Sequence, residues 1–311
     1  MHYDKTLISI VGPTGSGKTD LSIAVARHYS APIISTDSRQ FYRGIPIGTA
    51  QPDAEQLAAV EHHFIASHEI TDEFNCGAYE AAALQRLKEL FEQHDIVVAV
   101  GGSGLYIKAL CEGMDAMPEA DAHLRKELSD KLQQFGLEPL VEQLRELDEA
   151  TYNTIDRKNP ARVLRALEIC LSTGVPCSQI RTGERHKRDF NIVKIGVDMP
   201  RDILYDRINR RVDIMIQQGL EAEAQSVAHL RYCNSLQTVG YREMFDYFDG
   251  KSSREEAIEL IKRNSRRYAK RQMTWFRRDE EIAWFEPSKL TAIIDYIFRF
   301  SGDIHIHRLL Y

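Results

Sequence analysis

Apolar and polar residues follow a pattern of strands that alternate with helices along much of the chain. Strands are expected at "TLISIVG", "APIISTDS", "IVVAVGGSGLY" and "NIVKIGVDM", and helices at "TDLSIAVARHYS" and "CGAYEAAALQRLKELFEQHD". The strand stretches are almost continuously apolar, whereas the helical stretches space their apolar residues by three and four positions. This alternation is typical of a parallel sheet that is covered by helices on both faces.

From about Pro118 to Arg188 the pattern changes to helices only. The leucines of "HLRKELSDKLQQFG" stand four apart, and two further helical stretches follow, separated by Gly and Pro. Long helices return after Pro200. We therefore expect a catalytic core formed by residues 1–118 and 189–288, an all-helical inserted domain at 119–188 and a C-terminal tail at 289–311.

The stretch "GPTGSGKT", between the first predicted strand and helix, matches the P-loop pattern. Backbone N–H groups and the helix dipole at such a loop bind phosphate oxygens, Lys18 adds a positive charge, and the Thr19 hydroxyl can ligate Mg²⁺. The predicted diphosphate-binding residues are Gly12, Pro13, Thr14, Gly15, Ser16, Gly17, Lys18 and Thr19. The predicted fold is thus α/β, a P-loop NTPase-like parallel sheet flanked by helices, with Mg²⁺ as cofactor and Thr19 as the metal ligand.

Two acids end predicted strands and are candidates for the chemistry of this loop. Asp37 follows "IIST" and Asp198 follows "KIGV", and the guanine-reading NKxD motif of GTPases is absent. Asp37 should project at the carboxyl edge of the sheet, where ligands bind in open α/β folds, although an Asp here can also cap a helix. The glycines of "VGGSGLY" indicate either a tight turn or a place where backbone approaches a ligand.

One segment near the end of the chain is strongly basic and contains aromatic residues. Its cations are Lys262, Arg263, Arg266, Arg267, Lys270, Arg271, Arg277 and Arg278, with no acid among them, although the chain as a whole carries a formal charge of −6. Such a run is either a solvated helix face or a contact for a polyanion. The absence of nearby neutralising residues in the sequence favours the polyanion.

Composition narrows the class of protein further. The chain of 311 residues has five scattered cysteines without a CxxC pair, which is typical of a reducing compartment and not of a disulfide framework. No apolar run approaches the length of a membrane span, so we expect a soluble, cytoplasmic protein. His62, His63 and His68 lack a helix-spaced acid and are expected to be loop or surface residues without a metal.

Seven stretches together resemble the bacterial tRNA dimethylallyltransferase family, also called tRNA isopentenyltransferases. They are "GPTGSGKTDL", "IISTDSRQFYRGIPIGTAQP", "HHFI", "VGGSGLYIKALCEG", "RKNPARVLRALEI", "VGYREM" and "KRQMTWFRR", and they cover nearly the whole chain. The resemblance implies a prenyltransferase that moves a dimethylallyl group from dimethylallyl diphosphate to N6 of the adenosine 3′ of the anticodon, in tRNAs that read codons beginning with U. Diphosphate is released, so the P-loop would hold a leaving group. The implied partners are the tRNA anticodon stem-loop and dimethylallyl diphosphate, and we expect a monomer that does not contact membranes.

The resemblance also implies roles for individual residues. Asp37 would be the catalytic base, Thr14 would position the diphosphate or the proton, and Arg207 would neutralise the departing diphosphate, with Arg210 and Arg211 close by in the sequence. The adenosine would flip out of the anticodon loop, and donor and acceptor would enter a channel from opposite ends. The residues implied to contact tRNA are Asp37, Ser38, Arg39, Gln40, Ser103, Arg125, Ala161, Arg162, Val163, Leu164, Arg165, Gln237, Thr238, Val239, Gly240, Tyr241, Arg242, Lys270, Arg271, Gln272, Trp275 and Arg277.

Two departures from the family and two other classes of function have to be considered. Ser103 stands where the family often has Thr, and the zinc-finger extension of eukaryotic relatives is absent from this sequence. A P-loop kinase of a small metabolite would use the same loop for ATP and the helical insertion as a lid. A non-catalytic, nucleotide-gated RNA-binding module would bind tRNA without forming a product.

Overall fold

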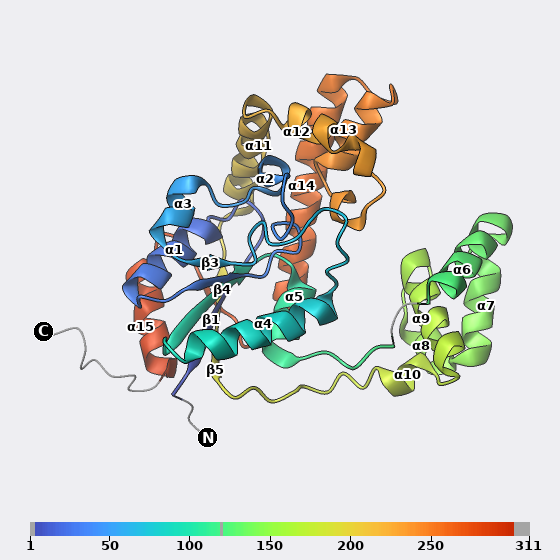
Figure 1. Ribbon diagram of the computed structural model, residues 1–311, viewed down its shortest axis with the longest axis horizontal. Coiled ribbons are helices and arrows are strands. Elements are labelled where there is room, and N and C mark those ends of the chain that lie inside the picture. The colour runs from blue at the N-terminus through green and yellow to red at the C-terminus, as the bar shows by residue number, and fades with distance from the viewer. Residues whose placement is uncertain (1–3, 119–120, 302–311) are drawn as a thin grey trace, which may run out of the picture. The chain divides into compact units, whose positions relative to one another are not determined.

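The computed structural model describes residues 4–118 and 121–301, and the chain divides into two compact units. Met1–Cys111 together with Arg188–Tyr311 form the first unit, and Glu112–Lys187 form the second. Figure 1 follows the chain through the elements of both. None of the helices in the described ranges combines the length and hydrophobicity needed to span a bilayer.

The first unit is built on a six-stranded sheet in which every neighbouring pair is parallel. Its strands are β1 (Thr6–Val11), β2 (Ile33–Ser35), β3 (His62–His63), β4 (Ile96–Gly101), β5 (Asn191–Val197) and β6 (Ala283–Phe285), in the spatial order β3-β2-β4-β1-β5-β6. The predicted α/β class with a parallel sheet is confirmed. The edge strands β3 and β6 were not predicted, because two or three residues are too few to show a period. His62 and His63, expected in a loop or on the surface, are partly buried in β3.

Side chains of the strands alternate between the two faces of the sheet. On β1, Ile8 and Ile10 belong to one buried cluster, whereas Leu7 and Val11 belong to another. The first cluster is covered by α1 (Lys18–His28) and α15 (Leu290–Ser301), and the second by α4 (Cys76–Phe91) and α5 (Gly104–Glu112). Figure 1 shows the strands between these two pairs of helices. Helices on both faces explain why the strands read as continuous apolar runs.

Further helices of the first unit pack beside the sheet. They are α2 (Pro46–Thr49), α3 (Ala54–Ala59), α11 (Arg201–Gln217), α12 (Leu220–Ser226), α13 (Tyr241–Phe248) and α14 (Arg254–Phe276), with short 3-10 turns η1 (Ala228–Leu230) and η2 (Asn234–Leu236). Helix α14 spans 23 residues and begins with a capping box between Ser253 and Glu256. It packs against α11 and α13, and Gln272, near its C-terminal end, contacts the loop after β1.

The second unit contains only helices. They are α6 (Ala122–Phe135), α7 (Glu138–Leu147), α8 (Glu149–Thr154), α9 (Pro160–Thr173) and α10 (Cys177–Ile180). The buried Leu128, Leu144, Val163 and Leu167 form part of its own core. Its bounds, Glu112–Lys187, begin a few residues before the predicted insertion at 119–188, of which residues 119–120 lie outside the described residues.

The sheet-containing unit continues beyond residue 288, where the sequence predicted a tail at 289–311. Residues Leu290–Ser301 form α15, whose Ile293 and Ile297 are fully buried against the sheet. Residues 302–311 lie outside the described residues.

Candidate functional site

The P-loop leaves the carboxyl end of β1 and leads directly into α1. Gly15 and Gly17 have φ angles of 80° and 88°, which L side chains rarely adopt, and Gly17 is the N-cap of α1. The ammonium of Lys18 donates to the carbonyl of Pro13 at 2.6 Å. Ser16 Oγ is buried and has no hydrogen-bond partner among the described residues. The loop therefore has the local geometry that surrounds phosphate oxygens with donors.

Three cavities adjoin this loop, and Arg211 lines all of them. An open cavity of about 330 Å³ lies over the loop and is lined by Gly15, Gly17, Lys18, Thr19, Asp20, Ala50, Gln51, Gln56, Arg207 and Arg211. A narrower cavity joins Lys18 and Thr19 to Thr14 and Asp37. A third, of about 110 Å³, joins Thr14 and Asp37 to apolar side chains. The narrower cavity by itself thus extends from Lys18 and Thr19 of the P-loop to Asp37.

Asp37 lies in the turn after β2, at the carboxyl edge of the sheet. Its Oδ1 accepts a hydrogen bond from the backbone N–H of Arg39 at 3.0 Å. In the described part of the chain, Oδ2 of Asp37 accepts no hydrogen bond and is available to a ligand in the two cavities that Asp37 lines. The carboxylate thus fixes its own turn with one oxygen, and it caps no helix.

The charges around Asp37 are predominantly positive. Burial lowers the pKa of Lys18 from its usual 10.5 to about 8, an effect that Asp37 partly opposes and Arg211 adds to. Burial also lowers the pKa of the Arg211 guanidinium, again opposed by Asp37, and Arg207 lowers it further. Two partly buried cations beside one carboxylate leave a net positive charge that favours binding of a further anion.

Three of the four arginines of α11, namely Arg207, Arg210 and Arg211, stand close together in sequence but have different surroundings. Arg207 is exposed and donates from Nε to the carbonyl of Gly15 at 3.0 Å, beside the open cavity. Arg210 is paired with Asp206 on its own helix and lines none of the three cavities. Arg211 lies deeper and donates to Thr14 Oγ1 at 3.4 Å. The family resemblance singled out Arg207 and named Arg211 only as standing close by in the sequence, one helical turn further along.

The "GGSG" turn after β4 brings protein segments close together. A Cβ at Gly101, Gly102 or Gly104 would lie 2.2–2.3 Å from atoms of Thr36, Gln272 or Trp275 respectively. Ser103 Oγ accepts from the backbone N–H of Ser38 and donates to Ser38 Oγ, each at 3.0 Å. The turn therefore fixes the segment that carries Asp37, and its glycines are required by close packing of protein atoms.

Asp198, the other acid at a strand end, lies away from the P-loop cavities. It accepts a hydrogen bond from Arg277 at 2.5 Å and lines a separate groove between α11 and α14. By contrast, Thr19 and Asp37 line the same cavity. A threonine hydroxyl is an oxygen ligand of the kind that Mg²⁺ accepts, so Thr19 in the P-loop fits this ion.

The basic segment 262–278 forms the exposed side of α14 and its C-terminal end. Two of its eight cations are neutralised, since Lys262 pairs with Asp213 and Glu259, and Arg277 pairs with Asp198. The expectation that the whole cluster lacks neutralising partners is therefore wrong. The exposed cations that remain unpaired among the described residues include Arg263, Arg267 and Lys270, while Arg271 lies over the ring of Tyr268.

Other residues implied to contact tRNA fall into two groups. The side chains of Arg39, Thr238 and Val239 line the apolar cavity with Asp37, and Trp275 is 39% exposed on α14. The buried members have protein partners instead. Gln40 donates to the carbonyl of Ala50, and Tyr241 donates to Glu223. Val163 lies in the hydrophobic core, and Gln272 is buried next to the P-loop. Gln237 and Arg242 are exposed.

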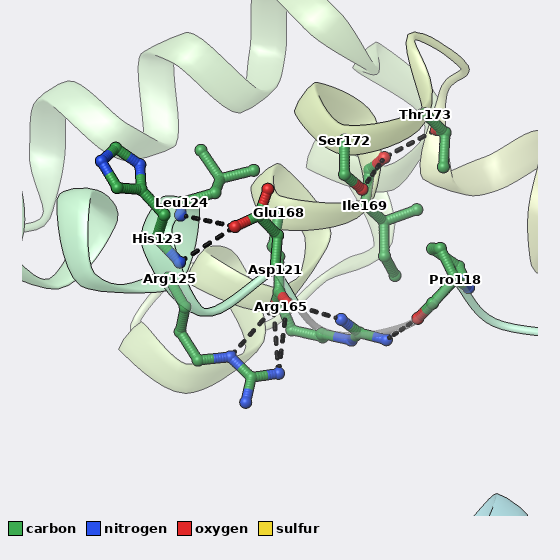
Figure 2. Close-up of polar contacts among 10 residues, drawn as sticks. All are labelled: Pro118, Asp121, His123, Leu124, Arg125, Arg165, Glu168, Ile169, Ser172 and Thr173. Carbon is green, nitrogen blue, oxygen red and sulfur yellow. Dashed lines mark hydrogen bonds and ion pairs between the residues drawn. The ribbon is translucent and has the colours of Figure 1, made fainter.

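In the helical unit, Arg125 on α6 and Arg165 on α9 share one buried carboxylate (Figure 2). Glu168 is only 2% exposed and lies 3.2 Å from Nη2 of Arg125 and 3.0 Å from Nη1 of Arg165. Arg165 also donates to the carbonyl of Pro118 at 3.1 Å. The two guanidinium groups thus have fixed positions at the surface and carry one net positive charge with Glu168. Ala161 and Arg162 are exposed and Leu164 is partly buried at the start of the same helix.

Comparisons with known proteins found similarities that extend over most of the chain. A family model described as IPP transferase matches residues 40–279. A tRNA dimethylallyltransferase of Cytophaga hutchinsonii is 48% identical over 94% of this chain and 97% of its own length. The crystal structure of a full-length tRNA isopentenylpyrophosphate transferase from Bacillus halodurans superposes with a TM-score of 0.72 at 38% identity, over 96% of this chain and 98% of that one. A eukaryotic dimethylallyltransferase acting on tRNA shares the fold, with a TM-score of 0.77 at 23% identity over 94% of this chain and 78% of that one.

Proposed function

The chain belongs to the IPP transferase family and is an enzyme of tRNA dimethylallyl transfer, and from this premise we propose which residues perform each part of the reaction. The donor would be dimethylallyl diphosphate and the acceptor N6 of the adenosine 3′ of the anticodon, in tRNAs that read codons beginning with U. The observation that supports the proposal is the narrow cavity lined by Lys18, Thr19, Asp37 and Arg211, where a diphosphate bound to the P-loop would lie near the Asp37 carboxylate.

The P-loop supplies the site for the leaving diphosphate. Negative charge grows on the diphosphate as the allylic carbon–oxygen bond breaks, and groups that stabilise this charge lower the barrier. Lys18, Arg207 and Arg211 surround the open cavity with positive charge, and Arg211 reaches Thr14 in the loop. Mg²⁺ held by Thr19 would supply further charge stabilisation to the diphosphate.

Asp37 supplies the base for the acceptor amine. The N6 amine of adenine is conjugated with its ring and weakly nucleophilic, so removal of its proton during attack assists the reaction. Oδ1 of Asp37 is held by Arg39 N–H, so Oδ2, which accepts no hydrogen bond among the described residues, would accept the proton. The adenosine reaches this depth only if it is flipped out of the anticodon loop.

The cavity of about 110 Å³ would provide a largely apolar environment for the five-carbon group. Its lining includes Ile208, Val212, Met215, Leu220 and Val239 beside Thr14 and Asp37. Positive charge develops on the allylic carbons as diphosphate leaves, and water in this place would capture them. Apolar walls exclude water, so the amine remains the available nucleophile.

The exposed cations of α14 provide a surface for the phosphates of tRNA. We predict that Arg267→Gln together with Lys270→Gln weakens tRNA binding and flattens its salt dependence, because each phosphate contact contributes to the slope of affinity against salt. Binding is measured by filter retention over a range of salt concentrations. Lys262→Gln is the control, because Lys262 is already neutralised by Asp213 and Glu259 and should change the slope little. An equal slope in wild type and the double variant would show that this face is exposed to solvent and does not contact tRNA phosphates.

The complete reaction is tested with purified protein, Mg²⁺, dimethylallyl diphosphate and an unmodified tRNA with an A-rich anticodon loop, in the absence of ATP. We expect mass spectrometry of the digested tRNA to show one dimethylallyl group on adenosine and release of diphosphate. Consumption of ATP without this product would instead support a kinase, and tRNA binding without any product would support a binding module. We also propose that the monomer is active, which light scattering during turnover can test.

A further inference from the structure

One residue of the basic helix α14 differs from its neighbours by being buried. Gln272 is 6% exposed, although Arg271 before it is exposed, as are Thr274 and Trp275 after it. A glutamine amide carries both a donor and an acceptor, and a buried amide is costly unless both are satisfied. The side chain of Gln272 must therefore have partners inside the protein, and it cannot serve as an exposed contact for RNA.

The two partners of Gln272 belong to different loops of the site. Its Oε1 accepts from the backbone N–H of Thr14 in the P-loop at 2.9 Å. Its Nε2 donates to the backbone carbonyl of Gly102 in the "GGSG" turn, also at 2.9 Å. A backbone N–H can only donate and a carbonyl can only accept, so these partners determine which end of the amide faces which loop.

The second of these loops is connected directly to the proposed base. Gly102 precedes Ser103, whose hydroxyl binds the backbone N–H and the hydroxyl of Ser38, the neighbour of Asp37. A Cβ at Gly102 would lie 2.2 Å from Nε2 of Gln272, so only glycine allows the amide to approach this closely. A short series of hydrogen bonds thus joins the P-loop, through Gln272, to the turn that holds Asp37.

Prenyl transfer depends on the separation of these two loops. The leaving diphosphate would be held by the P-loop, and the amine would be deprotonated by Asp37, whose neighbour Ser38 is bound by Ser103 of the other loop, with the allylic carbon between. Reaction requires the attacking atom within roughly 3–3.5 Å of the carbon, and small displacements from that geometry have large effects on rate. A group that links both loops through rigid backbone contacts would control this separation.

We propose that Gln272 is a positioning residue for prenyl transfer, whose buried amide holds the P-loop and the Gly102–Ser103 turn at the separation that the reaction requires. This inference rests on the proposed roles of the P-loop and Asp37. It differs from the role that the family resemblance implies for Gln272, because a tRNA contact would set affinity, whereas a positioning residue sets the rate of the chemical step.

The first test compares Gln272→Met with Lys270→Gln on the same helix. Methionine preserves length and bulk but removes both hydrogen bonds. We expect Gln272→Met to lower the single-turnover rate with saturating tRNA by about tenfold or more and to leave the KM for tRNA within about twofold. Lys270→Gln should instead raise this KM, as expected for a residue that contacts tRNA. A raised KM with an unchanged rate for Gln272→Met would overturn the proposal, as would no change in either quantity.

The second test uses Gln272→Glu and does not depend on the methionine variant being folded. A protonated carboxyl can accept from Thr14 N–H and donate to the Gly102 carbonyl, as the amide does, but an ionised one repels that carbonyl. Burial raises the pKa of a carboxyl introduced at this position. The rate of Gln272→Glu relative to wild type should therefore rise as the pH is lowered from about 8 to about 6. A constant ratio across this range contradicts the hydrogen-bonded linkage.

Both tests separate this inference from the proposed function itself. Wild-type protein that forms dimethylallyl adenosine while both variants match it in rate leaves the function intact and overturns the role of Gln272. Wild-type protein that forms no product overturns both. Thermal melting of each variant, followed by circular dichroism, shows whether a loss of rate arises from unfolding.

Discussion

Asp37→Asn is expected to lower the turnover number by at least tenfold while the affinity for tRNA is retained. General-base assistance typically contributes about 10²- to 10⁴-fold to a rate, and asparagine cannot accept the proton of the amine. The substitution is well suited to this question because the amide oxygen can still accept from Arg39 N–H, which holds the turn after β2. The measurement is the initial rate of dimethylallyl transfer at saturating tRNA, together with the equilibrium affinity for tRNA.

Asp198→Asn is the matched control for this prediction. Asp198 also follows a strand of the sheet, but it pairs with Arg277 and lines a separate groove, outside the cavities that adjoin the P-loop. Its turnover number should remain within about twofold of wild type, because no proposed proton transfer involves it. A turnover number of Asp37→Asn equal to that of wild type would remove Asp37 from the role of base.

The parts of the site that could be predicted from sequence are those formed by neighbouring residues. The P-loop follows one strand and begins one helix, so its glycines, Lys18 and Thr19 appear as a continuous pattern. Asp37 could be placed at the carboxyl edge because it directly follows an apolar strand. In both cases the local geometry depends on a few consecutive residues, and the rule that ligands bind at the carboxyl ends of parallel strands supplies the rest.

Contacts between distant parts of the chain could not be predicted in this way. Gln272 binds a backbone N–H that is 258 positions away in sequence, and helical spacing alone gives no indication of this partner. Arg211 and Arg207 occupy the same helix one turn apart, and only packing against the P-loop shows that Arg211 lies deeper. The fully buried Tyr241 illustrates the same limit, because its hydroxyl binds Glu223 on another helix.

The charges counted along the sequence revealed the basic helix but overestimated how many of its cations lack an acidic partner. The run from Lys262 to Arg278 contains no acid, yet Asp213 and Asp198 reach it from other elements. Neutralisation by acids distant in sequence depends on tertiary structure, and sequence windows cannot detect it. The exposed Arg267 and Lys270 therefore carry the prediction on salt dependence, and the paired cations serve as its control.

Lys18→Met should reduce the rate of prenyl transfer by about 10²- to 10³-fold, the range seen when a single preorganised donor to a developing negative charge is removed. Methionine approximates the length of the lysine stem but supplies no charge to the leaving diphosphate. The measurement is the single-turnover rate with tRNA and dimethylallyl diphosphate both saturating, so that weaker binding of the donor does not obscure the chemical step. A rate within about twofold of wild type would exclude Lys18 from stabilising the leaving group.

The pH dependence of the wild type provides an independent test of the same residue. Burial disfavours the ammonium of Lys18 in the free enzyme and lowers its pKa from 10.5 to about 8. Below this pKa the side chain is charged and can bind diphosphate, and above it the charged fraction of the free enzyme falls about tenfold for each pH unit. Because kcat/KM reports ionisations of the free enzyme, its value for dimethylallyl diphosphate should be constant below about pH 8 and decline above it.

Lys18→Met should lack this decline, since it has no group to titrate there, and the comparison cancels any ionisation of the substrates. A decline of equal size in the variant, or none in the wild type up to about pH 9.5, would show that the charge of Lys18 does not govern capture of the donor.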